Sequence, residues 1–414
     1  MSKIAYIGLP AHGHTNPTLP VVQELIQHGH DVLYYNAESF RTKVAPTGVD
    51  FRAYPEPMPT EREVAQAIRE LIDASLLLSG LSEQLTPFML AEIERERPDL
   101  ILYDTTAMWG YLAARKYHIP HICSVTHFVL NGSQGVLGRG FVRFLWSAIP
   151  HLPKLIRWKR RMKQRYGSIV GGITEYADLN LVFTSKEFHP ANIFIDGRWR
   201  GRFRFVGPSI KASTRDKSDF PFEQLNGERL VYISLGTINN LDLGFYRAAF
   251  AAFADYPAQF ILSVGKNTDI AQLGEIPANF IVRPYVPQLE ILQRVDAFIT
   301  HGGMNSVHEG LYYGVPEVVV PHQLEQLLNA KRVAATGASV VLGEQYPYGR
   351  VTAAELREEL NKVLADSSYR QHASQMGETL KAAGGYLQAV AEIEGFLETE
   401  YRVQSTALQV LSAE

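Results

Sequence analysis

Short apolar runs rich in β-branched and aromatic residues alternate with longer helix-like segments along the first third of the chain, and the alternation begins again after residue 224. Parallel α/β sheets require this order, because a crossover helix must connect each strand to the next and cover one face of the sheet. Between the first two runs, segment 16–29 has apolar residues at helical spacing and ends on a glycine. The strands expected in the first third are 3–10, 31–37, 99–104 and 121–125.

The length of 414 residues predicts two domains, because chains of this size usually divide into units of about 200 residues. Segment 207–223 has no apolar period and collects Pro, Ser, Asp and Lys, which is typical of a linker. We therefore expect an N-terminal domain over 1–206, a linker over 207–224 and a second doubly wound domain over 225–414. This division leaves open that the last helix packs back on the N-terminal domain.

Charge and composition restrict the partners. The chain has 40 Lys and Arg residues against 43 Asp and Glu, a net charge of -3, so no overall field favours nucleic acid or a membrane. No run of about 18 apolar residues and no signal sequence is present, and we expect a cytoplasmic protein. The single cysteine, Cys123, lies in an apolar run and is expected to be a buried thiol. The sequence does not indicate an oligomeric state.

Segment 141–165 is rich in aromatic residues and then strongly basic. It could form a lid over a ligand pocket or an element on a membrane surface. The third interpretation, an amphipathic helix with a solvated basic face, is the one that we favour, because charge runs usually face water.

The most informative segment is THGGMNSVHEG, residues 300–310, which directly follows a strand-like run. A Gly-Gly turn between a strand and a helix lets the backbone approach a phosphate, and the helix N-terminus offers N–H groups. His301 would face the anion, Asn305 and Ser306 would lie in the first turn, and Glu309 would lie one turn deeper, near ribose hydroxyls. Taken singly, these residues would be a turn, a loop histidine and an N-cap. Together they predict an anion site.

Two flanking loops extend this site. Upstream, Tyr285, the Val286 backbone and Gln288 could stack on a base and pair with its edge. Downstream, Glu325 and Gln326 follow another strand and could bind sugar hydroxyls, although such residues are more often found in the first turn of a helix.

A further loop, SLGT, follows the first strand of the second domain. Ser234 and Thr237 could donate hydrogen bonds to phosphate oxygens, and a simple turn explains the loop almost equally well.

In the first domain, the loop GLPAHGHTNP follows strand 3–10 and contains two candidate bases, His12 and His14. Both could be ordinary loop histidines. The glycines of this loop lack the spacing of a dinucleotide fingerprint, which argues against a nicotinamide-dependent dehydrogenase. Asp104 ends strand 99–104 and could hold a histidine ring nitrogen or cap the helix that is expected near Ala107.

Residues 285–326 as a whole resemble the signature box of the inverting UDP-glycosyltransferase superfamily, and within it the bacterial macrolide and natural-product glycosyltransferases. AHGHTNP, FVGPS and SLGT also resemble this family. The resemblance implies the GT-B fold, with two facing Rossmann-like domains, a cleft between them, the acceptor in the first domain and the donor in the second. Two residues depart from the family's usual pattern. The family often has Trp at the position of Tyr285 and Asp at the position of Glu325.

The resemblance also implies roles. His14 would be the base and Asp104 its partner. The donor-binding residues would be Ser234, Thr237, Tyr285, Val286, Gln288, His301, Gly303, Asn305, Ser306, Glu309, Glu325 and Gln326.

The expected activity is inverting transfer of a hexose, with glucose as the expected sugar, from a UDP-sugar to a hydroxyl of a lipophilic molecule such as a flavonoid or a macrolide. Met108, Phe128 and Trp146 are candidate acceptor contacts, because they supply apolar surface in the first domain. No Asp-x-Asp pair is present, and we expect neither a metal nor a cofactor. The alternatives are an epimerase, a membrane-associated glycosyltransferase with a lipid acceptor, and a non-catalytic nucleotide-sugar sensor.

Overall fold

The computed structural model describes residues 1–67, 70–129, 149–167, 177–190, 202–216, 218–236 and 242–411. The chain forms two compact units. Unit 1 comprises 1–59, 72–214 and 383–414, and unit 2 comprises 60–71 and 215–382. The chain passes from one unit to the other at residues 214 and 215, inside the segment that we expected to be a linker. The last helix, α15 (Gly385–Leu411), belongs to unit 1.

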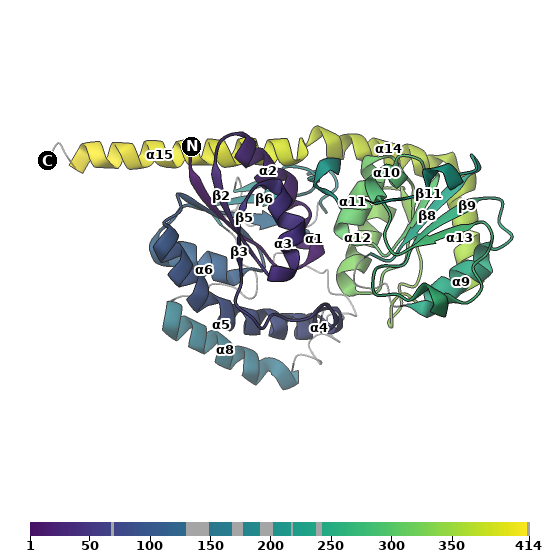
Figure 1. Ribbon diagram of the computed structural model, residues 1–414, viewed down its shortest axis with the longest axis horizontal. Helices are drawn as coiled ribbons and strands as arrows, with labels where there is room; N and C mark the ends of the chain where they lie inside the picture. Colours follow the sequence, from purple (N-terminus) through teal and green to yellow (C-terminus); the bar gives the residue numbers. More distant parts are fainter. Residues whose placement is uncertain are drawn as a thin grey trace. The chain divides into compact units, whose positions relative to one another are not determined.

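Unit 1 is built on a seven-stranded parallel sheet with the order β3-β2-β1-β4-β5-β6-β7 (Figure 1). Three of these strands, β3, β6 and β7, were not predicted from the sequence, because they are short and have no clear apolar alternation. The strands are β1 (Lys3–Ile7), β2 (Asp31–Asn36), β3 (Asp50–Ala53), β4 (Leu100–Asp104), β5 (His121–Val125), β6 (Leu179–Val182) and β7 (Phe203–Phe205).

Helices cover both faces of this sheet. Residues of α2, α3 and α15 share one apolar cluster with the strands, and residues of α5, α6 and α8 share the other. On the first face α15 contributes Ala389, Val390, Ile393 and Leu397, all buried. The helices of unit 1 are α1 (His12–Thr15), α2 (Thr18–Gln27), α3 (Arg41–Val44), α5 (Leu71–Glu96), α6 (Met108–Tyr117), α8 (Leu152–Tyr166) and α15.

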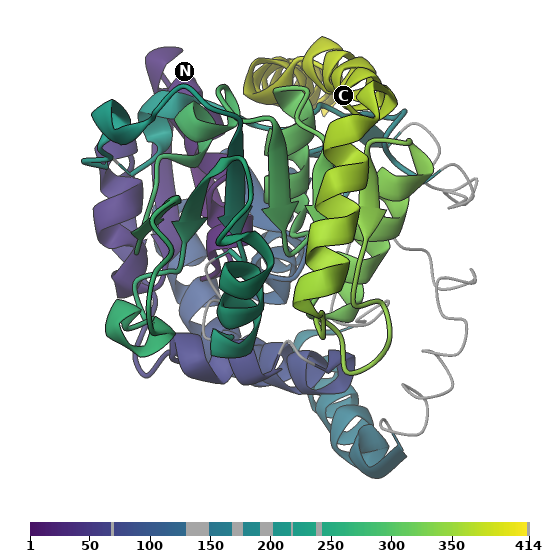
Figure 2. The same ribbon diagram turned by 90° about the vertical axis from the view of Figure 1, so that its right-hand side faces the viewer.

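Unit 2 has a six-stranded parallel sheet with the order β10-β9-β8-β11-β12-β13, and Figure 2 shows its green strands among the helices that cover them. Residues of α9 and α13 pack on one face, and residues of α10 pack on the other. The strands are β8 (Leu230–Ser234), β9 (Gln259–Ser263), β10 (Phe280–Arg283), β11 (Ala297–Thr300), β12 (Glu317–Val319) and β13 (Ser339–Val341). The helices are α4 (Glu61–Ala67), α9 (Leu243–Phe253), α10 (Gln288–Leu292), α11 (Met304–Tyr312), α12 (Leu324–Ala335), α13 (Ala353–Ala365) and α14 (Ser367–Ala382).

Each sheet has one point where the strand order reverses. In unit 1 it lies between β1 and β4, and in unit 2 between β8 and β11. Open α/β sheets bind ligands beyond the carboxyl ends of their strands at this point. In unit 1, His14 lies after the end of β1 and Asp104 is the last residue of β4. In unit 2, Ser234 is the last residue of β8 and His301 directly follows β11. In the part of the chain described here, no helix is long and apolar enough to cross a membrane.

Candidate active site and nucleotide site

A histidine and a carboxylate meet at the switch point of unit 1. Nδ1 of His14, on α1, lies 2.7 Å from Oδ2 of Asp104, the last residue of β4. The Asp104 side chain is 1% exposed and the His14 side chain 25%. When Nδ1–H donates to Asp104, Nε2 of His14 holds the lone pair, which is the arrangement of a carboxylate-oriented base.

The other oxygen of Asp104 is held by the next turn. Oδ1 accepts hydrogen bonds from the backbone N–H of Thr106 (2.9 Å) and from its hydroxyl (2.5 Å). Burial alone would raise the pKa of Asp104, but the charge on His14 and the hydrogen bonds from His14 and Thr106 lower it below its usual value. The N-cap of α6 is Ala107, so the alternative role of Asp104 as the cap of this helix is wrong.

The two histidines of the first loop have different surroundings. The ring of His12 packs against Phe40, with centroids 5.0 Å apart, whereas His14 contacts Asp104. The Thr126 hydroxyl also lies 3.1 Å from Nδ1 of His14. The geometry therefore favours His14 as the base.

His127 is a nearby residue that the sequence did not indicate. Its Nδ1 donates to the Phe128 carbonyl (2.8 Å), and its Nε2 lies 3.1 Å from the Thr105 hydroxyl. Burial lowers the pKa of His127, and the charge of His14 adds to this effect. Because both nitrogens are engaged and the ring is kept neutral, His127 is a supporting residue beside the His14 pair.

Two of the three predicted acceptor contacts, Met108 and Phe128, lie within the described residues. Met108 begins α6 and is buried in the core of unit 1. Phe128 is also buried, with its ring against Phe188. Trp146 lies outside the described residues. Acceptor contacts for these residues stay a prediction.

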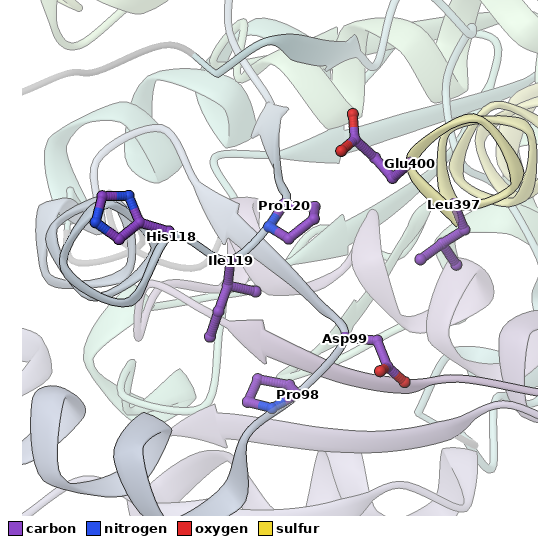
Figure 3. Close-up of a pocket in the computed structure, with 7 residues that line it drawn as sticks. All are labelled: Pro98, Asp99, His118, Ile119, Pro120, Leu397 and Glu400. Atoms are coloured by element: carbon purple, nitrogen blue, oxygen red, sulfur yellow. The ribbon is translucent and has the colours of Figure 1, made fainter. Parts of the chain in front are cut away.

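A surface pocket of unit 1 lies away from this histidine. Residues 98–99 and 118–120 precede β4 and β5, so the pocket is at the opposite edge of the sheet from Asp104. In Figure 3 the carboxylates of Asp99 and Glu400 point in different directions. The Asp99 carboxylate already accepts a hydrogen bond from the Lys3 backbone (2.7 Å). This pocket has no part in the site described here.

In unit 2, the His301 ring lies against two glycine backbones. A Cβ on Gly236 or on Gly303 would be 2.5 Å from an atom of this ring, and Gly236 has a φ of +76°. Both positions therefore require glycine. Burial lowers the pKa of His301 to about 3, with a contribution from His322. The neutral ring can offer an N–H group to an anion.

The loop after β8 is described as far as Gly236. Ser234 is buried at the end of the strand, and its hydroxyl accepts a hydrogen bond from the Gly236 N–H (3.2 Å). Thr237 lies outside the described residues.

Helix α11 begins directly after the Gly-Gly turn. Its N-cap is Gly303 and no side chain caps it, so the interpretation of Asn305 as the N-cap is wrong. Asn305 and Ser306 lie in the first turn, as the sequence predicted. The first N–H groups of such a helix have no intrahelical partner and favour an anion.

Glu309 lies one turn further along α11 and is almost fully buried, with 4% of its side chain exposed. Its Oε2 accepts a hydrogen bond from Nε2 of Gln288 (2.6 Å), and its Oε1 forms an ion pair with Arg215. The structure thus joins Gln288 and Glu309, which the sequence predicted separately. It adds Arg215, which the sequence did not indicate.

Tyr285 and Val286 precede α10. Tyr285 is partly exposed, and its hydroxyl donates to the Asp216 carbonyl (3.1 Å). Val286 is buried. The aromatic ring therefore comes just before Gln288, the first residue of α10, which is hydrogen-bonded to Glu309 on α11.

Glu325 and Gln326 lie in the first turn of α12 but make different contacts. Glu325 is exposed, and its Oε1 accepts a hydrogen bond from Asn329 (2.6 Å). Gln326 is buried, and its Oε1 accepts one from the His322 backbone (2.9 Å). Asn329 also donates to the Gly302 carbonyl (2.9 Å), which ties this turn to the Gly-Gly loop.

Comparison with known proteins is consistent with these two sites. The family described as "Erythromycin biosynthesis protein CIII-like, C-terminal domain" matches residues 248–392. The chain is 34% identical over 395 residues to the NDP-glycosyltransferase YjiC of Bacillus subtilis, covering 95% of this chain and 97% of that protein. This chain belongs to the bacterial macrolide and natural-product glycosyltransferases.

Other relatives support the same membership in the inverting UDP-glycosyltransferase superfamily. Demethyllactenocin mycarosyltransferase of Streptomyces fradiae is 31% identical over 414 residues, covering 96% of this chain and 87% of that protein. The solved structure of the kitacinnamycin glycotransferase has a TM-score of 0.80 at 27% identity and covers 96% of this chain and 99% of that chain. The predicted GT-B fold is thereby confirmed. The glycosyltransferase's independence of metals and cofactors stays a prediction.

Proposed function

We propose that this glycosyltransferase transfers a hexose, with glucose as the expected sugar, from a UDP-sugar to a hydroxyl of a lipophilic small molecule. The observation that carries the proposal is the pairing of His14 with the buried Asp104 at the switch point of unit 1. A nucleotide-binding protein without an acceptor reaction would have no need of an oriented base at that position.

His14 is the general base of the proposed reaction. The acceptor oxygen attacks the anomeric carbon while Nε2 of His14 takes up the hydroxyl proton. The bond from the anomeric carbon to the β-phosphate oxygen breaks in the same step, UDP leaves, and the anomeric centre inverts. The Asp104 carboxylate stabilises the imidazolium that forms.

Unit 2 supplies the proposed donor site. The uncapped N-terminus of α11 and the N–H group of the neutral His301 would bind the diphosphate. Tyr285 would stack on uracil, Glu309 would accept hydrogen bonds from the ribose, and Glu325 with Gln326 would contact the sugar.

The proposed acceptor is a flavonoid, a macrolide or a similar lipophilic alcohol. Demethyllactenocin mycarosyltransferase and the kitacinnamycin glycotransferase are named for natural products, which supports this class.

A donor panel tests the proposal. UDP-glucose, UDP-galactose and dTDP-glucose are each mixed with one flavonoid and one macrolide, and nucleotide release and an added hexose mass are measured. We expect product from UDP-glucose, loss of transfer in His14→Ala with UDP binding retained, and transfer retained in the matched variant His12→Ala. Near-normal turnover by His14→Ala would contradict the role of the base. Product from dTDP-glucose alone would contradict the donor.

One observation favours a second candidate function, a membrane-associated glycosyltransferase with a lipid acceptor. Helix α8 has seven Lys and Arg residues and no acidic residue. Trp158 and Met162 hold it to the core, while Ile149, Leu152 and Ile156 are about half exposed, between 45% and 52%. Exposed apolar side chains among cations are typical of helices that lie on anionic bilayers.

Co-sedimentation with vesicles separates the two candidates. Binding to phosphatidylglycerol vesicles but not to phosphatidylcholine vesicles, weakened in Leu152→Ser/Ile156→Ser, would favour the membrane-associated enzyme. No binding to either vesicle would leave the small-molecule reaction as the function.

A further inference from the structure

The ion pair of Arg215 with Glu309 adds a residue to the proposed donor site. We propose that Arg215 is a positioning residue, which holds the Glu309 carboxylate in the orientation that accepts hydrogen bonds from the ribose hydroxyls of the nucleotide. The inference rests on the proposed function, because it deepens the role given there to Glu309.

Arg215 ends a continuous polar chain inside unit 2. Its guanidinium pairs with Oε1 of Glu309, whose Oε2 accepts the hydrogen bond from Gln288. The hydroxyl of Tyr232 in turn donates to Oε1 of Gln288 (3.1 Å). Side-chain exposure is 18% for Arg215 and 4% for Glu309, so the ion pair is largely removed from water.

The residue after Arg215 contacts the other half of the nucleoside site. The carbonyl of Asp216 accepts the hydrogen bond from the Tyr285 hydroxyl. The two-residue segment 215–216 therefore contacts both the aromatic ring proposed for the base and the carboxylate proposed for the ribose. This double contact places the segment at the nucleoside site and not at an unrelated surface.

The Glu309 carboxylate can accept further hydrogen bonds from the hydroxyls of a ribose. Each carboxylate oxygen has two lone pairs. Arg215 uses one on Oε1 and Gln288 one on Oε2, so each oxygen can still accept one hydrogen bond from a neighbouring pair of hydroxyls. Arg215 thus fixes the carboxylate without competing for the whole of its acceptor capacity.

Removal of the guanidinium would leave Oε1 of Glu309 without the partner that fixes it. Gln288 would then hold only Oε2, and the carboxylate could turn away from the ribose hydroxyls. Nucleotide affinity would fall, and the loss would lie in the contact with the ribose.

The test is calorimetric binding of UDP, without acceptor, to the full chain. In Arg215→Met we expect UDP affinity to fall about tenfold, because the Glu309 carboxylate loses the charge-assisted contact that orients it. Arg215→Lys restores a charged partner and should retain most of the affinity. The matched control is Arg247→Met on α9, whose guanidinium donates to the Gln272 carbonyl (3.3 Å) at an exposed position.

A second ligand, 2′-deoxy-UDP, measures the ribose contact directly. Wild type should prefer UDP, and the preference should shrink in Arg215→Met. Unchanged UDP affinity in Arg215→Met, or a loss that is equal for UDP and 2′-deoxy-UDP, would overturn the inference while the proposed function stands. Absence of UDP binding by wild type would overturn the proposed function and the inference with it.

Discussion

Glu317 on β12 is a carboxylic acid in an apolar interior, and its replacement should stabilise unit 2. The residue is 0% exposed, and neither carboxyl oxygen has a hydrogen-bond partner among the described residues. Its Oε1 lies over Gly310, where a Cβ would be 2.2 Å from it. Burial raises the pKa of Glu317 well above its usual value, so the native side chain keeps its proton to a higher pH than the unfolded chain does.

The substitution Glu317→Met keeps the length of the side chain and removes both polar atoms. A buried polar group without a partner costs about 1–3 kcal/mol, and we expect Met to raise the free energy of unfolding by this amount at about pH 4. At about pH 4 the Glu317 carboxyl is protonated in the native state and mostly protonated in the unfolded state, so proton release contributes little to this difference. The packing over Gly310 should change little, because an unbranched chain of similar volume replaces another.

The gain should grow with pH. Above about pH 4.3 the unfolded Glu317 releases its proton while the native residue retains it, so the wild type loses about 1.4 kcal/mol per pH unit until its raised native pKa is reached. Glu317→Met has no such proton. The difference in free energy of unfolding between the two proteins should therefore widen by the same amount per unit.

Hydrogen exchange is the appropriate assay, because the tryptophans of the described residues, Trp109 and Trp158, both belong to unit 1. Amides of α11 and β12 should exchange more slowly in Glu317→Met, and tryptophan fluorescence should report the same unfolding of unit 1 in both proteins. The matched control is Glu358→Met, at an exposed position of α13. A variant that is less stable than wild type, or a gain that does not vary with pH, would refute this reasoning.

Three further changes test the two sites and the core. Asp104→Asn should lower kcat about a hundredfold or more with little effect on UDP affinity, because the imidazolium of His14 loses its carboxylate; unchanged kcat would contradict this. Gly236→Ala should weaken UDP binding in calorimetry, because a Cβ would be 2.5 Å from the His301 ring; equal affinity would show that the ring has no part in binding. Burial lowers the pKa of His308 to about 3. The unfolded state therefore binds the proton first as pH falls below about 6.5, and stability declines by about 1.4 kcal/mol per unit. His308→Leu should flatten this decline in hydrogen exchange between pH 6.5 and about 4, and an unchanged slope would exclude His308 as its cause.

The local sequence pattern was sufficient to predict the strands and the turn that surround the two switch points. The strands β1, β4 and β5 are continuous apolar runs, and the Gly-Gly turn before α11 is a strong local signal. The short edge strands β3 and β7 have no such signal, because a strand of three or four residues is defined by its neighbour more than by its own sequence.

Contacts between distant segments were harder to predict. The resemblance indicated the pairing of His14 with Asp104, which are 90 residues apart and are brought together by the parallel pairing of β1 with β4. Arg215 could not be found in this way, since it lies in a segment whose composition indicated only a linker. Its partner Glu309 is 94 residues away, and only the folded chain joins the two.

The return of α15 to unit 1 affects the order in which the glycosyltransferase can fold during its synthesis. Ala389, Val390 and Ile393 cover an apolar face made by the first strands and α2, so this face stays open until the last segment has left the ribosome. At about 5–20 residues per second, unit 2 has many seconds to form while unit 1 waits for its final helix. We therefore expect nascent chains of this protein to need a chaperone that covers the apolar face of their N-terminal segment until α15 has been made.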